Sequence, residues 1–85
     1  MEIVLSEKAE EHIAYWKGTN NKVIEKRIVA LKNAIIVSPF TGIGKPEPLK
    51  HELSGKWSRR IDRKNRFIYS VENETLYIFS LKGHY

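Results

Sequence analysis

The chain has 85 residues, of which 41% are hydrophobic and 11% aromatic, and it has no cysteine. This length and composition predict one folded domain spanning residues 1–85 and exclude disulfide bonds and thiolate metal sites. Its 15 Lys and Arg against 10 Asp and Glu give a net charge of +5, which favours an anionic partner such as nucleic acid, although many small basic domains bind none.

The N-terminus carries glutamates where a secretion signal needs basic residues followed by an apolar run. No stretch approaches the roughly 18 apolar residues of a membrane span. We therefore expect a cytoplasmic protein that has no membrane partner.

The first half of the chain predicts a short strand and two helices. Residues 2–5 alternate weakly and favour a strand, and Ser6 is a suitable N-cap for a helix that ends near Gly18. A second helix begins near Asn20 and stops before Ser38, because the proline that follows disfavours helical geometry there. The apolar faces of the two helices are formed by Ala9, Ile13 and Trp16, and by Ile24, Ile28, Leu31 and Ile35. The helices are expected to form a hairpin.

The second half changes from helical to twofold periodicity. Residues 38–48 hold all three prolines and two of the five glycines, which predicts a loop of the kind that often carries function. Three strands then follow, over residues 57–62, 66–71 and 76–82. The predicted fold class is α+β, with an N-terminal strand and a two-helix hairpin packed on an antiparallel β-meander.

The meander gathers basic residues at one end of the sheet. If residues 73–74 form a turn, Val71 faces Leu76 and Arg66 lies opposite Leu81, or one residue away if the register slips. His84 follows just beyond that end. The other hairpin turns at residues 63–64 and brings its own cations to the same edge. The cluster comprises Arg59, Arg60, Arg63, Arg66, Lys82, His84 and Tyr85.

Such a cluster suits an RNA phosphodiester. Guanidinium groups offer paired donors to phosphate oxygens, imidazole exchanges protons near neutral pH, and an aromatic ring stacks on a base. RNA supplies its own nucleophile in the 2′-hydroxyl, so a cleaving enzyme needs a base, an acid and positive charge, with no metal or other cofactor. His51-Glu52-Leu53 lacks the second histidine of a zinc-protease helix, which also argues against a metal.

Each candidate also has a plainer interpretation. Arg59 and Arg63 are equally compatible with solvated strand and turn residues, and chain termini such as His84-Tyr85 usually fray without a role. Glu47 lies between two prolines, which stiffen its backbone either to hold a catalytic carboxylate or merely to shape the loop.

Four motifs carry a resemblance that runs over essentially the whole chain. They are Lys45–His51 (KPEPLKH), Leu53–Gly55 (LSG), Trp57–Ile61 (WSRRI) and the terminal His84–Tyr85. In these motifs the chain resembles the YoeB/Txe toxins, which belong to the RelE-like superfamily of toxin-antitoxin systems.

The resemblance implies a ribosome-dependent endoribonuclease that cuts mRNA in the A site of the 70S ribosome and is neutralised by a cognate antitoxin protein. It implies that Glu47 is the general base, Arg66 stabilises the charged phosphorane, His84 is the general acid and Tyr85 orients the substrate. A homodimer is also plausible for the family. Contacts to RNA or the ribosome are expected from Lys50, Arg59, Arg60, Arg63, Lys64 and Lys82.

Two functions of other classes remain compatible with these residues. A non-catalytic inhibitor that occupies the ribosome is expected to survive replacement of His84 by Gln and to fail on charge reversal at Arg59 and Arg60. A protein-interaction module that only receives an acidic antitoxin segment is expected to cleave no RNA under any condition.

Overall fold

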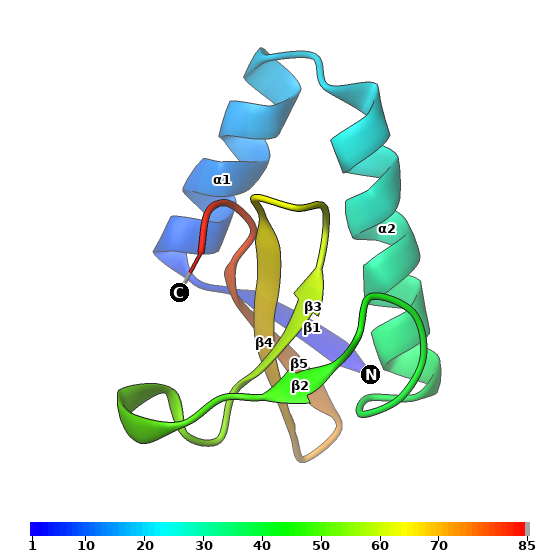
Figure 1. Ribbon diagram of the computed structural model, residues 1–85, viewed down its shortest axis with the longest axis vertical. Helices are drawn as coiled ribbons and strands as arrows, with labels where there is room; N and C mark the ends of the chain where they lie inside the picture. Colours follow the sequence, from blue (N-terminus) through cyan, green and yellow to red (C-terminus); the bar gives the residue numbers. More distant parts are fainter. Residues whose placement is uncertain (85) are drawn as a thin grey trace.

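The computed structural model describes residues 1–84 as a five-stranded sheet with two helices packed on one face (Figure 1). The strand order is β1-β5-β4-β3-β2. The elements in chain order are β1 (Glu2–Leu5), α1 (Glu7–Gly18), α2 (Lys22–Val37), β2 (Glu47–Pro48), the 3-10 turn η1 (His51–Leu53), β3 (Trp57–Arg60), β4 (Arg66–Glu72) and β5 (Thr75–Ser80).

Both helices begin at side-chain caps. The Ser6 hydroxyl accepts a hydrogen bond from the Ala9 N–H at 3.0 Å, and the Asn21 side chain accepts one from the Ile24 N–H at 3.1 Å. These caps satisfy donors that the first turn leaves without partners. The predicted Ser6 cap and the end of α2 before Ser38 are confirmed.

The sheet is mixed, which differs from the purely antiparallel meander expected from the sequence. The meander itself is present in β3, β4 and β5, but β1 adds in parallel along β5, and β2 adds antiparallel along β3. A hairpin is indicated by its turn residues, whereas the β1–β5 pairing joins Glu2 to Thr75, with no local sequence signal. Pro48 is tolerated because β2 is an edge strand.

A β-bulge displaces the register between β4 and β5. Val71 pairs with Leu76 as predicted and Tyr69 pairs with Ile78, but Ile68 pairs with Ser80, which leaves Phe79 as the extra residue. The predicted pairing of Arg66 with Leu81 is therefore wrong by a one-residue shift. The backbone N–H of Arg66 instead donates to the Gly83 carbonyl at 3.1 Å.

The two faces of the sheet have different roles. The face that packs on the helices carries the buried side chains of Phe67, Tyr69, Leu76 and Ile78. Alternation along the strands sends Glu47, Ser58, Arg60, Arg66 and Ile68 to the opposite face, which we call the site face. The core and the candidate chemistry are thus separated by the sheet.

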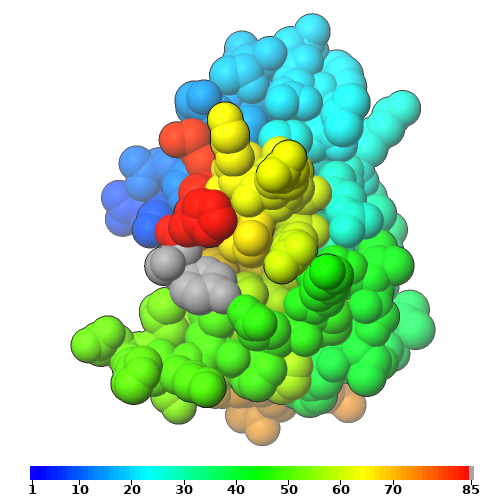
Figure 2. All heavy atoms as spheres, viewed as in Figure 1, coloured from blue at the N-terminus to red at the C-terminus, as the bar shows by residue number. Residues whose placement is uncertain are grey.

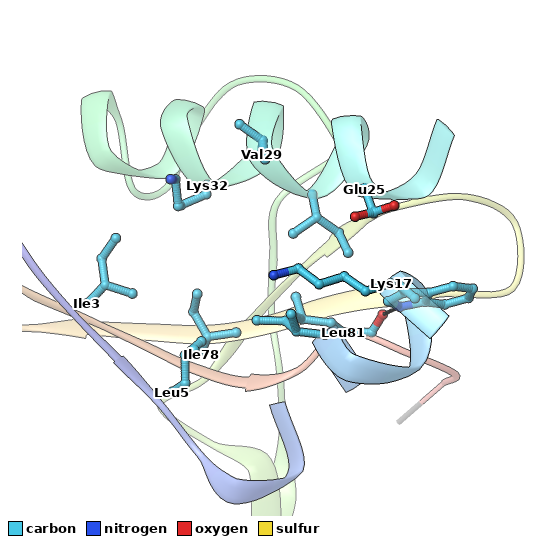
Figure 3. A pocket seen from close by; sticks show the side chains of 11 residues that line it. Ile3, Leu5, Lys17, Glu25, Val29, Lys32, Ile78 and Leu81 are labelled. Atoms are coloured by element: carbon cyan, nitrogen blue, oxygen red, sulfur yellow. Dashed lines mark hydrogen bonds between the residues drawn. The ribbon is translucent and has the colours of Figure 1, made fainter. Parts of the chain in front are cut away.

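An apolar groove of about 330 Å³ remains open between α1, α2, β1 and β5 (Figure 3). Ile3 lies in it and is 41% exposed, and the side chain of Lys17 reaches from α1 into the space between the helices. Neither helix of the described chain has the length and apolar surface that crossing a bilayer requires.

Candidate functional site

The loop before β2 is held by a buried arginine. Arg59 is 0% exposed, and its guanidinium donates to the carbonyls of Ser38 at 2.7 Å, Thr41 at 2.8 Å and Ile43 at 3.1 Å. Its Nε donates to the Tyr69 hydroxyl at 3.1 Å. These bonds fix residues 38–43 against the sheet, directly upstream of β2.

The placement of Arg59 corrects one of the sequence predictions. A fully buried guanidinium whose donors are taken by backbone carbonyls is not available to a phosphate, so Arg59 leaves the set of expected RNA contacts. Alternation explains the difference, because neighbours in a strand face opposite sides and only Arg60 of the basic pair lies on the site face. Arg59 is a structural residue of β3 that holds the loop in place.

Tyr69 completes the anchor of this loop. Its hydroxyl donates to the Pro39 carbonyl at 2.6 Å while it accepts from Arg59. Burial raises the pKa of Tyr69, and the hydrogen bond and charge of Arg59 offset only part of that rise. The hydroxyl therefore remains protonated and keeps its role as a donor at physiological pH.

Glu47 reaches the site through the short strand β2. It pairs with Ser58, and Pro48 pairs with Trp57, so the end of the predicted 38–48 loop is a strand rather than irregular backbone. Gly44 makes the approach possible: it has φ +84°, and a Cβ there would lie 2.8 Å from Leu31 Cδ2.

Glu47 shares a polar cavity of about 180 Å³ with two arginines on the site face. Arg60 and Arg66 are directly paired across β3 and β4. We call this the basic cavity, and its lining residues are Lys45, Glu47, Ser58, Arg60 and Arg66. Sequence reasoning missed Lys45 and Ser58, although Ser58 is two residues from Arg60 in a strand and shares its face.

Arg66 is oriented by the turn between β3 and β4. Its Nη1 donates to the carbonyls of Asp62 at 2.8 Å and Asn65 at 3.2 Å. Asp62 in turn accepts from the backbone N–H groups of Lys64 and Asn65. Burial by itself raises the pKa of Asp62, but these hydrogen bonds, that of the Asn65 amide and the charge of Arg66 outweigh it and hold the pKa below its ordinary value. The carboxylate that shapes the turn is therefore ionised near neutral pH.

The C-terminal segment is tied to the same turn. Gly83 has φ +80°, its N–H donates to Asn65 Oδ1 at 2.8 Å, and its carbonyl accepts from the Arg66 N–H. The predicted proximity of Arg66 to the end of the chain is confirmed. Tyr85 lies outside the described residues.

Two side chains of α1 hold the strand end that precedes this segment. Trp16 Nε1 donates to the Leu81 carbonyl at 2.9 Å, and His12 Nδ1 accepts from the Leu81 N–H at 3.0 Å. Burial lowers the pKa of His12, and the charges of Lys8 and Lys82 lower it further against an opposing effect of Glu11. His12 is therefore a packing residue, and its neutral ring suits the acceptor role.

His84 lies in a second cavity of about 380 Å³, beside the basic cavity. Figure 2 shows the C-terminal segment in red adjoining the yellow β3–β4 turn. The cavity, which we call the tail cavity, is lined by Ser6, Lys8, Leu53, Lys56, Ile68, Phe79, Ser80 and His84. The structure thus brings Glu47 and Arg66 together and places His84 in the neighbouring cavity.

The remaining predicted cations are exposed. Lys82 lies with its Nζ 4.4 Å from the centre of the Tyr15 ring. The others are Lys50, Arg63 and Lys64. Within residues 1–84 no group of three His, Cys, Asp or Glu side chains gathers in a way that could hold a metal ion.

Comparison with known proteins decides the family. Residues 5–85 match the model of YoeB-like toxins of bacterial type II toxin-antitoxin systems. The chain belongs to the YoeB toxin family. The Escherichia coli K12 toxin YoeB is 40% identical over all 85 residues, covering both chains completely.

Two solved structures from Staphylococcus aureus share the fold. A YoeB chain from a YoeB-YefM complex has a TM-score of 0.91 at 40% identity, and one described as a YoeB dimer has 0.91 at 38%. Each match covers 100% of this chain and 98% of the other. The RelE-like toxin fold expected from the sequence is confirmed, with a mixed sheet.

Proposed function

We propose that this YoeB-family toxin is a ribosome-dependent endoribonuclease that cuts mRNA in the A site of the 70S ribosome and thereby inhibits translation. The observation that carries the proposal is that Glu47, Arg60 and Arg66 line one cavity while His84 lies in the next, all on one face of the sheet. A carboxylate, guanidinium groups and an imidazole can supply the base, the charge stabilisation and the acid that transfer of an RNA phosphoryl group to the 2′-hydroxyl requires.

In the proposed reaction the Glu47 carboxylate takes the proton of the 2′-hydroxyl, and the 2′-oxygen attacks the adjacent phosphorus. Arg66, with Arg60 beside it, stabilises the negative charge that develops on the phosphorane oxygens. The bond from phosphorus to the 5′-oxygen then breaks, and the imidazolium of His84 gives its proton to that oxygen. The products are a 2′,3′-cyclic phosphate and a 5′-hydroxyl. No metal or cofactor enters these steps, because RNA supplies the nucleophile.

The outer residues are assigned to binding. Tyr85 is proposed to orient the substrate, as the family resemblance implies, and Lys82 to add positive charge near the C-terminal segment. Lys50, Arg63 and Lys64 are exposed, and they are proposed to contact messenger or ribosomal RNA phosphates.

We further propose that binding to the ribosome or RNA completes the site. Gly83 precedes His84, and Glu47 and His84 line separate cavities in the free chain. A ribosome complex in which Glu47, Arg66 and His84 keep the positions they have here would contradict this step.

The partners are inferred from relatives. The Staphylococcus aureus YoeB forms a toxin-antitoxin complex with YefM and is also described as a dimer. We propose that the present chain binds a cognate antitoxin that silences it, that it forms a homodimer, and that it acts in the cytoplasm, where its ribosomal substrate is found.

Toeprinting on translating ribosomes tests the nuclease assignment. The wild-type chain is compared with the variants His84→Gln and Glu47→Gln. It is also tested on a second messenger whose nucleotide at the cut site lacks the 2′-hydroxyl. Cleavage by the wild type alone, and only of the unmodified messenger, is the expected result. A stall of equal strength with all three proteins and an intact messenger would instead establish the second candidate function, a non-catalytic inhibitor that blocks the A site.

A further inference from the structure

The tail cavity has the character of a small-molecule subsite. Its volume of about 380 Å³ lies within the range of about 300–1,000 Å³ that is common for ligand sites. Ile68 and Phe79 provide apolar surface, and Lys8 and Lys56 are also among its lining residues. Apolar area next to a few cations suits a ligand that has both a flat ring and a phosphate.

The β5 bulge explains why Phe79 and Ser80 both reach this cavity. In a regular strand, successive side chains point to opposite faces. Here Ile78 pairs with Tyr69 and Ser80 pairs with Ile68, so Phe79 is the unpaired residue of the bulge. A bulge re-aims side chains, and both Phe79 and Ser80 line the tail cavity.

A row of paired residues across the sheet links the basic cavity to the tail cavity. Glu47 pairs with Ser58, Ser58 with Ile68, and Ile68 with Ser80, which makes a row of directly opposed residues over four strands. Directly opposed side chains are near neighbours on one face. A ligand chain that starts at Glu47 and follows this row therefore arrives at Phe79 and His84.

We infer that the tail cavity is the binding subsite for the nucleoside on the 3′ side of the cleaved bond. This rests on the proposed nuclease function. The nucleotide that supplies the 2′-hydroxyl must lie at Glu47, and the 5′-oxygen protonated by His84 belongs to the next nucleotide. The RNA therefore runs from the basic cavity at its 5′ end into the tail cavity, where the base of that next nucleotide stacks on Phe79.

Lys56 links the aromatic ring to the phosphate chemistry. Its Nζ lies 4.3 Å from the centre of the Phe79 ring in the free chain. A lysine has a long flexible side chain, so it can leave the ring to the incoming base and move to the adjacent phosphate. Stacking on an aromatic side chain tolerates every base, so the subsite selects for the presence of a base more than for its identity.

A binding experiment tests the subsite without cleavage. The probe is a dinucleotide with a 2′-deoxy linkage, which cannot be cut, carrying the fluorescent base 2-aminopurine at the 3′ position. We expect the full-length chain to quench it strongly, Phe79→Leu to lose the quenching, and Tyr77→Leu to retain it. Tyr77 is the matched control, because it is a half-buried aromatic residue of the same strand outside the tail cavity.

The same variants are then assayed for cleavage on programmed ribosomes. An abasic nucleotide 3′ to the cut is expected to slow cleavage by the wild type by about 10- to 100-fold. Phe79→Leu is expected to cleave the unmodified messenger more slowly by a similar factor, and the abasic nucleotide is expected to slow this variant no further. Phe79→Leu keeps apolar volume, and its thermal unfolding is compared with wild type so that a folding defect is recognised.

The outcomes separate the two proposals. Quenching that depends on Phe79 together with an uncut messenger would refute the nuclease function and retain the subsite as a base-binding site. Normal cleavage with no quenching, or with equal quenching by the wild type and Phe79→Leu, would overturn the subsite and leave the nuclease function in place. Stronger quenching with 2-aminopurine at the 5′ position would reverse the proposed direction of the RNA and also overturn the assignment.

Discussion

The hydroxyl of Tyr69 helps to anchor the loop that precedes Glu47 and β2. It accepts from Arg59 Nε at 3.1 Å and donates to the Pro39 carbonyl at 2.6 Å. Tyr69→Phe deletes both bonds and retains the ring, which packs edge-on against Phe67 with centroids 5.8 Å apart. The change leaves a buried, charged donor of Arg59 without its acceptor.

The magnitude follows from these two bonds. A hydrogen bond that involves a charged group contributes about 1.5–3 kcal/mol, and a neutral one about 1 kcal/mol. We therefore expect Tyr69→Phe to lower the free energy of unfolding by about 2–4 kcal/mol. In a domain of this size each kcal/mol corresponds to about 4–8 °C, so the melting temperature should fall by on the order of 10 °C or more.

The assay is thermal unfolding followed by circular dichroism, with Tyr77→Phe as the control. The Tyr77 hydroxyl makes no hydrogen bond within residues 1–84, so its removal should shift the melting temperature by less than about 2 °C. Messenger cleavage at a temperature where both variants are folded should fall only in Tyr69→Phe. If the two variants melt together with the wild type, the hydroxyl does not anchor the loop and the reasoning fails.

Two further predictions concern His12 and Gly44. Because the pKa of His12 is lowered in the folded chain, the unfolded chain binds more protons below about pH 6.5, and stability is lost as the pH falls through the folded pKa. His12→Gln should therefore flatten the profile of melting temperature against pH between about pH 7.5 and 5. Identical profiles for the variant and the wild type would refute this prediction. Gly44→Ala places a Cβ 2.8 Å from Leu31 Cδ2, whereas a Cβ at Gly55, which has a similar φ of +93°, meets no atom within 4 Å. In urea unfolding, Gly44→Ala should therefore lower the free energy of unfolding by about 1–3 kcal/mol more than Gly55→Ala does. Equal losses of free energy would show that backbone strain alone matters.

Much of the fold was predictable because its signals are local. Ser6 caps α1, the proline after Ser38 ends α2, and the alternation after residue 56 marks the meander. The partner of β1 was not predictable, because four weakly alternating residues do not specify a strand more than 70 positions away. The bulge at Phe79 was missed for a similar reason: nothing in an alternating run marks its extra residue.

The sequence predicted which region of the sheet holds the candidate site, but not the role of every residue in it. The proximity of Arg66 to the end of the chain followed from the meander, and Glu47 shares its cavity. The WSRR motif looked like a basic pair, yet one arginine is buried beneath the loop and the other lies on the site face. Side chains along a strand alternate between the two faces of the sheet, so the register of the strand decides which arginine points inward. Two adjacent charged residues do not indicate that register.

The parallel pairing of β1 with β5 has a consequence for the biosynthesis of this toxin. Strand β1 finds its partner only in β5, more than 70 positions later in the chain, and the Ser6 hydroxyl donates to the Phe79 carbonyl of the same strand. A chain grows from its N-terminus, so the sheet cannot close while the ribosome is still adding the residues of β5. The segment that carries His84 follows directly. A copy whose synthesis stops before β5 therefore has neither a closed sheet nor its candidate acid.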